Sequence, residues 1–218
     1  MCGAAIAFVV AFVGAARADP AAISPDASRP EHLAQTFIQY GLAFTGEVVV
    51  APGPICSGQV GCILGTGGGL TLRVGRRLRG PFYLGAAYEF AKMDSNQLYR
   101  LAILQQARAE GRYYISTGRI TEPYLTASAG LAGYGNLWGL DTAGPTFGLG
   151  VGTEFQLSTY IVVGLSISYR AVFLAQFHDS TETNSQTPGP CDADPACHQA
   201  GFSHLFGFDL VIETRDPF

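Results

Sequence analysis

The sequence predicts an all-β protein, an eight-stranded antiparallel up-and-down transmembrane β-barrel. Two observations predict this fold class. Eight segments of about ten or more residues alternate apolar side chains with small or polar ones, as a strand with two unlike faces does. No segment beyond the N-terminus approaches the roughly 18 consecutive apolar residues of a membrane-spanning helix. If the chain meets lipid, it therefore meets it as strands.

The composition separates the chain from an ordinary soluble domain. Only 14% of its 218 residues are charged and 48% are hydrophobic, whereas roughly 25% charged residues is typical of soluble proteins. The formal net charge is −4 with histidine neutral. Because a negative chain does not attract a phosphate backbone, we expect no nucleic-acid partner.

The N-terminus reads MCGAAIAFVVAFVGAARADP and has the features of an export signal. An apolar stretch precedes the motif ARA at residues 16–18, which has the small-x-small form of a signal-peptidase site, so we predict a signal peptide over residues 1–18. The signal lacks the usual basic residues at its start, which a misplaced translation start would explain. Residues 19–36 are rich in proline, alanine and serine and are predicted to form a periplasmic linker before a barrel at 37–218.

Four cysteines remain once Cys2 leaves with the signal peptide. Cys56 and Cys62 enclose SGQVG, and Cys191 and Cys197 enclose DADPA, so the same spacing occurs twice in segments rich in glycine or proline. An even number in an exported chain favours disulfides, and we expect one within each pair. A single four-cysteine metal site is the alternative, but zinc ligands usually lie two to four residues apart. We therefore expect no metal and no cofactor.

The first four strand segments run through FIQYGLAFTGEVVV, ILGTGGGLTLRVG, PFYLGAAYEFA and YRLAILQQARAEGRYYI. The apolar face of the first carries Ile38, Tyr40, Leu42, Phe44, Val48 and Val50. The apolar face of the second carries Leu64, Leu70, Leu72 and Val74. The fourth segment is rich in helix formers, which leaves a helix as its alternative. Its alternation of Ala107 and Ala109 with Arg108 and Glu110 favours a strand.

The last four segments run through PYLTASAGLAGYG, FGLGVGTEFQL, YIVVGLSISYRAVFLAQF and FGFDLVIE. In the sixth, Gly148, Gly150 and Gly152 stand where a soluble strand would put bulky polar side chains toward water. The apolar faces of the last three segments are predicted to face lipid: Leu149, Val151, Phe155, Ile161, Val163, Leu165, Ile167, Phe206, Phe208 and Leu210.

The predicted connections alternate in length. The long ones cover residues 51–62, 92–98, 135–143 and 178–201, and the short ones cover residues 76–80, 116–122 and 158–159. Long loops at one end and tight turns at the other are typical of outer-membrane barrels, whose turns face the periplasm. Both expected disulfides then lie in loops on the outer side.

A narrow lumen explains the small residues opposite each apolar face. Strands enter a membrane only as a closed barrel, and eight strands leave room for little beyond side chains. The inward faces are predicted to carry four basic and five acidic residues: Glu47, Arg73, Glu89, Arg108, Glu110, Arg112, Glu154, Arg170 and Asp209. A buried unpaired charge costs several kcal/mol, so we expect a network of ion pairs that fills the lumen. A gated ion path lined by the same charges is the alternative.

Aromatic residues near the strand ends are candidates for interfacial girdles, although ordinary packing accounts for them nearly as well. They are Tyr83, Tyr113, Tyr114, Tyr124, Tyr134, Trp138, Tyr160 and Phe177. Arg76, Arg77 and Arg79 are expected in a periplasmic turn, where they can contact phospholipid phosphates. The solubility of the turn explains these arginines equally well.

The signal peptide, the eight segments, the alternating connections and the C-terminal FGFDLVIETRDPF together resemble the small outer-membrane β-barrels of Gram-negative bacteria, the OmpA/OmpX-like class. The resemblance covers residues 37–218. It implies an outer-membrane location, outer-membrane lipids as partners, and a terminal aromatic residue that the barrel-assembly machinery reads during insertion. Phe218 matches that residue, but we expect Asp216 and Pro217 to interrupt the strand before it.

The resemblance implies architecture and location but not a specific role, because a fold does not fix function. A structural role, or binding of an extracellular ligand through the outer loops, is the leading interpretation. A small porin-like channel for ions or solutes is the first alternative, and a lipid-modifying enzyme the second. Lipid A deacylases that resemble this class use a histidine and a serine two positions apart. Here Ser203 and His204 are adjacent, so they face opposite ways, and we predict no catalytic residues.

Overall fold

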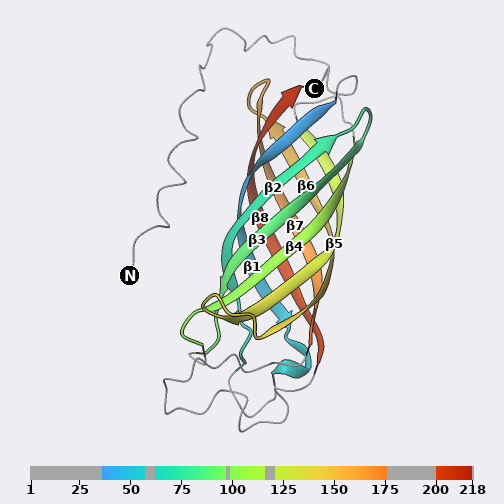
Figure 1. Ribbon diagram of the computed structural model, residues 1–218. Helices are drawn as coiled ribbons and strands as arrows, with labels where there is room; N and C mark the ends of the chain where they lie inside the picture. Colours follow the sequence, from blue (N-terminus) through green and yellow to red (C-terminus); the bar gives the residue numbers. More distant parts are fainter. Residues whose placement is uncertain (1–35, 57–61, 97–98, 116–120, 176–199, 218) are drawn as a thin grey trace, which may run out of the picture.

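The computed structural model describes residues 36–56, 62–96, 99–115, 121–175 and 200–217, and these form one closed barrel of eight strands (Figure 1). Each strand pairs antiparallel with the next in the chain, and the last pairs with the first. The strands are β1 (Phe37–Ala51), β2 (Gly67–Arg77), β3 (Phe82–Met93), β4 (Ala102–Tyr114), β5 (Thr121–Asn136), β6 (Thr142–Gln156), β7 (Ile161–Leu174) and β8 (Gly201–Pro217). The predicted all-β, eight-stranded up-and-down barrel is confirmed.

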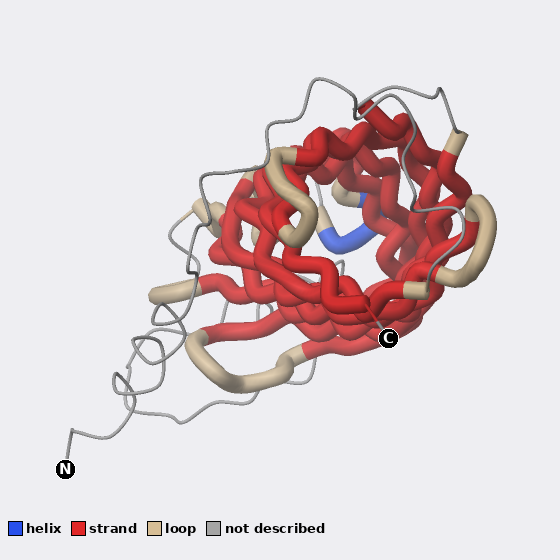
Figure 2. The backbone as a smooth tube through the Cα atoms, turned by 90° about the horizontal axis from the view of Figure 1, so that it is seen from above, coloured by secondary structure: helices blue, strands red, loops and turns tan. Residues whose placement is uncertain are grey.

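The strands are long enough to cross a bilayer. They range from 11 residues in β2 to 17 in β8, whereas a tilted transmembrane strand needs about nine to eleven. Figure 2 shows the closed ring in a view along the barrel. The fourth segment is a strand and not the alternative helix, because pairing with β3 and β5 outweighs the local preference of its helix formers. Among the described residues, no helix is long and apolar enough to span a membrane.

The two ends of the barrel differ. The start of β1, the end of β8 and the connections 78–81 and 157–160 lie at one end, which we call the turn end (Figure 1). The connection 137–141 lies at the other end, which we call the loop end, together with the short 3-10 helix η3 (Gly53–Ile55). One of the predicted long loops is wrong: β5 and β6 leave only residues 137–141 between them, because Gly135 and Asn136 still pair with β4.

The outer face is apolar over most of the barrel height. All ten residues predicted to face lipid point outward, from Leu149 at 68% exposure to Phe155 at 38%, with Val163 half-buried. A continuous apolar surface of this kind would aggregate in water. The closed ring has no free edge and leaves no unpaired ladder groups for lipid to meet. The outer face is therefore suited to hydrocarbon.

Two local expectations were wrong. Leu64 is not on an outward strand face: β2 begins only at Gly67, and Leu64 is buried at the loop end. Asp216 and Pro217 do not interrupt β8, since they pair with Ile38 and Phe37 at its end. A proline at a strand end removes no interior ladder bond, and the Asp216 carboxylate accepts a hydrogen bond from the Tyr40 hydroxyl at 3.0 Å.

Several predictions lie outside the described residues. They are the signal peptide over residues 1–18, nearly all of the linker, the disulfide between Cys191 and Cys197, Phe177, and the terminal Phe218.

Candidate functional site

The inward faces of the strands carry charge. All nine residues predicted for the lumen lie inside the barrel, and none is more than 5% exposed. Four further charged residues lie there too: Arg77, Glu122, Glu213 and Arg215. The predicted position of Arg77 in a turn is wrong, because β2 extends to Arg77 and its side chain points inward. The described lumen therefore holds six arginines and seven carboxylates.

A first cluster lies toward the loop end and centres on Arg170 of β7. Its Nη1 is 2.6 Å from Oε2 of Glu89 on β3 and also pairs with Glu47 on β1. Arg108 Nη1 approaches the same Glu89 oxygen at 2.9 Å. Four strands are thus joined through two arginines and two carboxylates.

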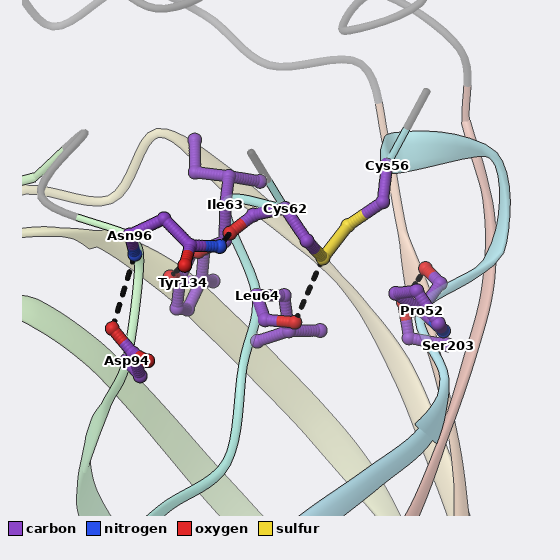
Figure 3. The surroundings of a disulfide bond; sticks show 9 residues. All are labelled: Pro52, Cys56, Cys62, Ile63, Leu64, Asp94, Asn96, Tyr134 and Ser203. Carbon is purple, nitrogen blue, oxygen red and sulfur yellow. Dashed lines mark hydrogen bonds between the residues drawn. A yellow bond between two sulfur atoms is a disulfide. The ribbon is translucent and has the colours of Figure 1, made fainter. Parts of the chain in front are cut away.

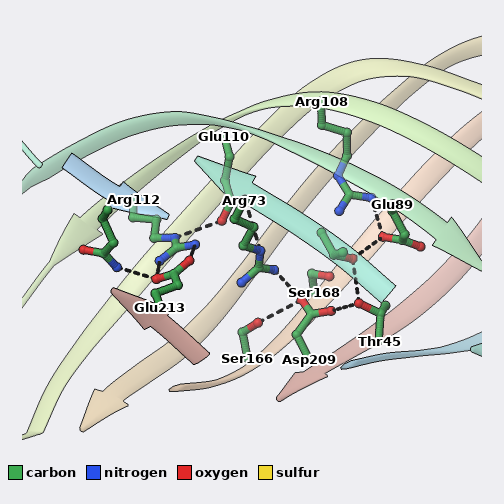
Figure 4. A network of polar contacts seen from close by, with 12 residues as sticks. Thr45, Arg73, Glu89, Arg108, Glu110, Arg112, Ser166, Ser168, Asp209 and Glu213 are labelled. Atoms are coloured by element: carbon green, nitrogen blue, oxygen red, sulfur yellow. Dashed lines mark hydrogen bonds and ion pairs between the residues drawn. The ribbon is translucent and has the colours of Figure 1, made fainter. Parts of the chain in front are cut away.

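The middle of the lumen is held by Arg73 and Asp209, as Figure 4 shows. Arg73 Nη2 lies 2.7 Å from Asp209 Oδ2, and Arg73 Nε lies 3.6 Å from Glu110 Oε2. Asp209 also accepts hydrogen bonds from the hydroxyls of Thr45 at 2.7 Å and Ser166 at 3.0 Å. The carboxylate therefore has a cation and two neutral donors around it, which offsets its loss of water.

A third cluster lies toward the turn end, where Arg112 contacts three carboxylates. Its Nε is 2.9 Å from Glu110, its Nη1 is 2.8 Å from Glu154, and its Nη2 is 2.9 Å from Glu213. Arg215 adds a contact of 2.5 Å to Glu154. Because Glu110 also faces Arg73, and Asp209 lies 3.7 Å from Arg170, the three clusters form one charge network.

Tyrosines line the turn end of the network. Tyr83, Tyr114 and Tyr124 are buried together in the lumen. The Arg112 guanidinium lies 4.5 Å from the centre of the Tyr83 ring, and the Tyr114 hydroxyl donates to Glu154 at 2.5 Å. Their expected place in an outer girdle was wrong, as it was for the buried Tyr134. Each of these tyrosines has inward strand parity.

The remaining girdle candidates differ from the four buried tyrosines. Tyr113, Trp138 and Tyr160 are exposed on the outside. Tyr113 is the strand neighbour of the inward Tyr114, so the two rings point to opposite faces.

A cluster of buried apolar residues lies at the loop end. Ile55, Ile63 and Leu64, from the connection between β1 and β2, pack against inward residues of five strands. These inward residues are Ala91, Met93, Ala102, Leu104, Ala132, Tyr134, Val172, Leu174 and Leu205. We call Ile55, Ile63, Leu64 and these inward residues together the mouth cap. The sequence pattern did not predict the mouth cap. Leu104, Val172 and Leu205 have the same inward parity as the lumen charges, and such a change from charged to apolar inward residues near the strand ends is the signal that could have indicated it.

The expected disulfide between Cys56 and Cys62 is present and closes the connection that carries the cap (Figure 3). Hydrogen bonds fix the connection to the barrel wall. The Tyr134 hydroxyl donates to the Ile63 carbonyl, Asn96 Nδ2 donates to the Cys62 carbonyl at 2.7 Å, and the Ser203 hydroxyl donates to the Pro52 carbonyl at 2.8 Å. The cap is therefore attached at several points and not merely folded over the opening.

Ser203 and His204 point to opposite sides of the wall. Ser203 is buried inside, whereas His204 lies outside with Nδ1 2.7 Å from the Tyr169 hydroxyl. Within the described ranges, no group of three or more histidine, cysteine or acidic side chains could hold a metal ion.

Comparison with solved structures identifies the fold. The chain is similar to Neisserial surface protein A, with a TM-score of 0.51 and 14% identity over 84% of this chain and 97% of that one. It is also similar to the outer membrane protein OprG from Pseudomonas aeruginosa (TM-score 0.46, 9% identity, 84% and 96% covered). A third similar structure is Ail, the attachment invasion locus protein of Yersinia pestis (TM-score 0.42, 12% identity, 84% and 98% covered). No family model and no curated protein sequence matches the chain.

The fold is that of the small eight-stranded outer-membrane β-barrels, as the sequence predicted. A barrel of this fold with an apolar outer face belongs in an outer membrane.

Proposed function

We propose that the chain is an integral outer-membrane barrel with a closed lumen, which contributes to the membrane as a structural element and presents its loops for binding at the cell surface. The observation that carries this proposal is the content of the lumen. The mouth cap, the charge network and the three tyrosines follow one another from the loop end to the turn end.

The ion pairs of the charge network favour a closed lumen rather than an ion path. Arg112 contacts three carboxylates and lies over the Tyr83 and Tyr124 rings. Breaking a buried ion pair by removing one partner costs about 3–5 kcal/mol. An ion passing through would have to separate such pairs and displace the mouth cap as well. A small channel, the alternative function, would need a continuous hydrated path.

Conductance in planar bilayers tests the closed lumen. The purified barrel should give no current steps above those of a protein-free bilayer. A variant with Arg112→Ser and Arg170→Ser, together with Ile63→Ser in the cap, removes side chains from three levels and should conduct. Folding of each protein is checked by whether the unboiled sample migrates differently from the boiled one on a gel. Discrete steps from the unaltered protein would make the channel the better function.

Cells that lack the protein, and one variant of the chain, separate the structural role from the surface-binding role. Cells that lack the protein should admit more hydrophobic dye and tolerate less detergent if the barrel itself supports the membrane. A barrel in which residues 178–200 are replaced by a short glycine-serine linker should then restore both properties. Failure of this variant, with normal amounts of folded barrel, would shift the function from the barrel to that loop.

An enzymatic role has less support. Ser203 and His204 lie on opposite faces, and the lumen carboxylates are engaged by arginines. Expression of the chain should therefore leave the mass of lipid A unchanged. A new lipid A species that appears only with the folded barrel would contradict this.

A further inference from the structure

A polar pocket lies at the loop end. Its volume is about 410 Å³, and it is formed where β3 and β4 meet the connection between them and Thr66, the residue before β2. The polar residues that line it include Thr66, Lys92, Asp94, Ser95 and Arg100. Met93 and Ala102 also line it, so the pocket borders the mouth cap.

Two cations in this pocket have no acidic partner among the residues that the structure describes. No carboxylate of the described residues lies within ion-pair distance of Lys92 or Arg100. Both are exposed, whereas the six lumen arginines are all buried and paired. Asp94 is the one carboxylate among the lining residues, and its Oδ1 accepts a hydrogen bond from the Asn96 amide at 3.0 Å. The described residues that line the pocket therefore carry a net charge of +1, which suits an anion.

The pocket is braced by its own hydrogen bonds. The Asp94 amide donates to the Thr66 carbonyl at 2.9 Å, and the Gly65 amide donates to the Asp94 carbonyl at 2.7 Å. The Tyr99 amide donates to the Ser95 hydroxyl at 3.2 Å. Together with the bond from Asn96 to Cys62, these contacts hold both sides of the pocket to the barrel wall. Lys92 and Arg100 are thus carried by segments that are hydrogen-bonded to the barrel.

The height of the pocket relative to the apolar face indicates which anion it meets. Phe90 of β3 stacks on Trp138, with ring centroids 5.3 Å apart, and Trp138 is 76% exposed. Tryptophan on the outside of a membrane protein marks the level of the headgroups. Lys92 is two residues beyond Phe90 on the same face, about 7 Å further along the strand. It therefore lies on the headgroup side of the aromatic pair.

We propose that Lys92 and Arg100 bind the phosphate group of a phosphorylated glycolipid in the outer leaflet. The lipid's acyl chains lie along the apolar face below Phe90 and Trp138, and its phosphate enters the pocket between the two cations. An arginine supplies directed N–H donors to phosphate oxygens and a lysine supplies a mobile positive charge. The site holds one lipid molecule at a fixed position against the barrel. This proposal is separate from the proposed closure of the lumen.

Fluorescence of the purified barrel in detergent micelles tests this assignment. Trp138 is the only tryptophan in the chain, so its emission reports on this end of the barrel alone. Diphosphoryl lipid A should change the emission in a saturable way, and fully dephosphorylated lipid A should not. The double variant K92Q/R100Q should bind about tenfold or more weakly, as expected for the loss of two charge-assisted contacts.

Matched variants exclude a general effect of charge. Arg79→Gln removes an exposed cation from the turn end and should bind lipid A as the unaltered protein does. Asp94→Asn keeps a hydrogen-bond acceptor and removes the one carboxylate among the described lining residues, so binding should tighten about threefold, in the range of a surface charge pair. Migration on a gel before and after boiling confirms that each variant folds.

Three results would overturn the proposal. They are unchanged binding by K92Q/R100Q, an equal response to dephosphorylated lipid A, or inorganic phosphate binding as tightly as the lipid, which would make the ligand a soluble anion. The conductance measurement does not depend on any of these results, so the two proposals can fail separately.

Discussion

Arg112 on β4 donates from Nη2 to Oε1 of Glu213 on β8 at 2.9 Å, although 101 residues separate the two in the chain. The bond spans the lumen between strands that are not neighbours in the sheet. It therefore ties opposite walls of the barrel together, which no ladder hydrogen bond can do. Both residues also take part in further polar contacts, so the effect of removing either one extends beyond this pair.

Replacing Arg112 by alanine should destabilise the barrel strongly. The change leaves Glu110, Glu154 and Glu213 without their shared cation, and uncompensated buried charge costs about 3–5 kcal/mol. Urea unfolding in lipid vesicles, followed by the emission of Trp138, measures the free energy of unfolding. Arg79→Ala at the exposed turn is the control and should stay within about 0.5 kcal/mol. A loss of under 1 kcal/mol in the Arg112 variant would show that water replaces the guanidinium at little cost.

Exchanging the charges of Arg77 and Glu122 should largely restore what either single change removes. The two side chains form a two-pronged pair, with N–O distances of 2.7 and 3.0 Å. R77E or E122R alone places like charges side by side in the lumen, whereas the double variant R77E/E122R restores opposite charges. The coupling free energy from the double-mutant cycle should reach about 1–3 kcal/mol. Additive effects of the two changes would mean that this pair contributes nothing of its own.

The faces of the strands could be predicted because alternation is a local property of the sequence. The outward position of Leu149 and the inward position of Glu154 follow from a period of two alone. The partner of each lumen charge does not follow from it. Arg112 meets Glu213 only because the barrel closes with a particular stagger between its strands. No short stretch of the sequence predicts that stagger.

The places where a strand ends were harder to predict than its faces. Leu64 has the spacing of an outward residue of β2. The chain joins the sheet only at Gly67, however, and Leu64 packs in the mouth cap. Arg77 was assigned to a turn because three arginines and two glycines crowd that region, although its parity matches Arg73. If the alternation of β2 is continued to the end of the strand, Arg77 points inward. The same alternation in β4 places Tyr113 outside and Tyr114 inside.

Removing the disulfide should loosen the mouth cap and leave the charge network intact. Cys56 and Cys62 are six positions apart, and a closed loop of that size stabilises a fold by about 2 kcal/mol in the chain-entropy model. The variant C56S/C62S should therefore exchange the amide hydrogens of Ile63 and Leu64 faster, while those around Arg112 stay protected. Hydrogen exchange read by mass spectrometry checks both regions at once. Unchanged exchange at Ile63 and Leu64 would mean that the Tyr134 and Asn96 bonds hold the cap without the disulfide.

Gly41 should resist even the smallest substitution. A β-carbon placed there would lie 2.0 Å from the Ile212 carbonyl oxygen and 2.8 Å from Cγ of Glu213, so strand backbone as well as side chain would have to shift. Overpacking of this kind costs about 1–3 kcal/mol, and it would disturb Glu213 in the charge network. Gly46 on the same strand is the matched control, because nothing lies within 4 Å of a β-carbon there. Gly41→Ala should lower the urea midpoint, and Gly46→Ala should not. Equal effects of the two changes would show that the backbones of β1 and β8 move apart at little cost.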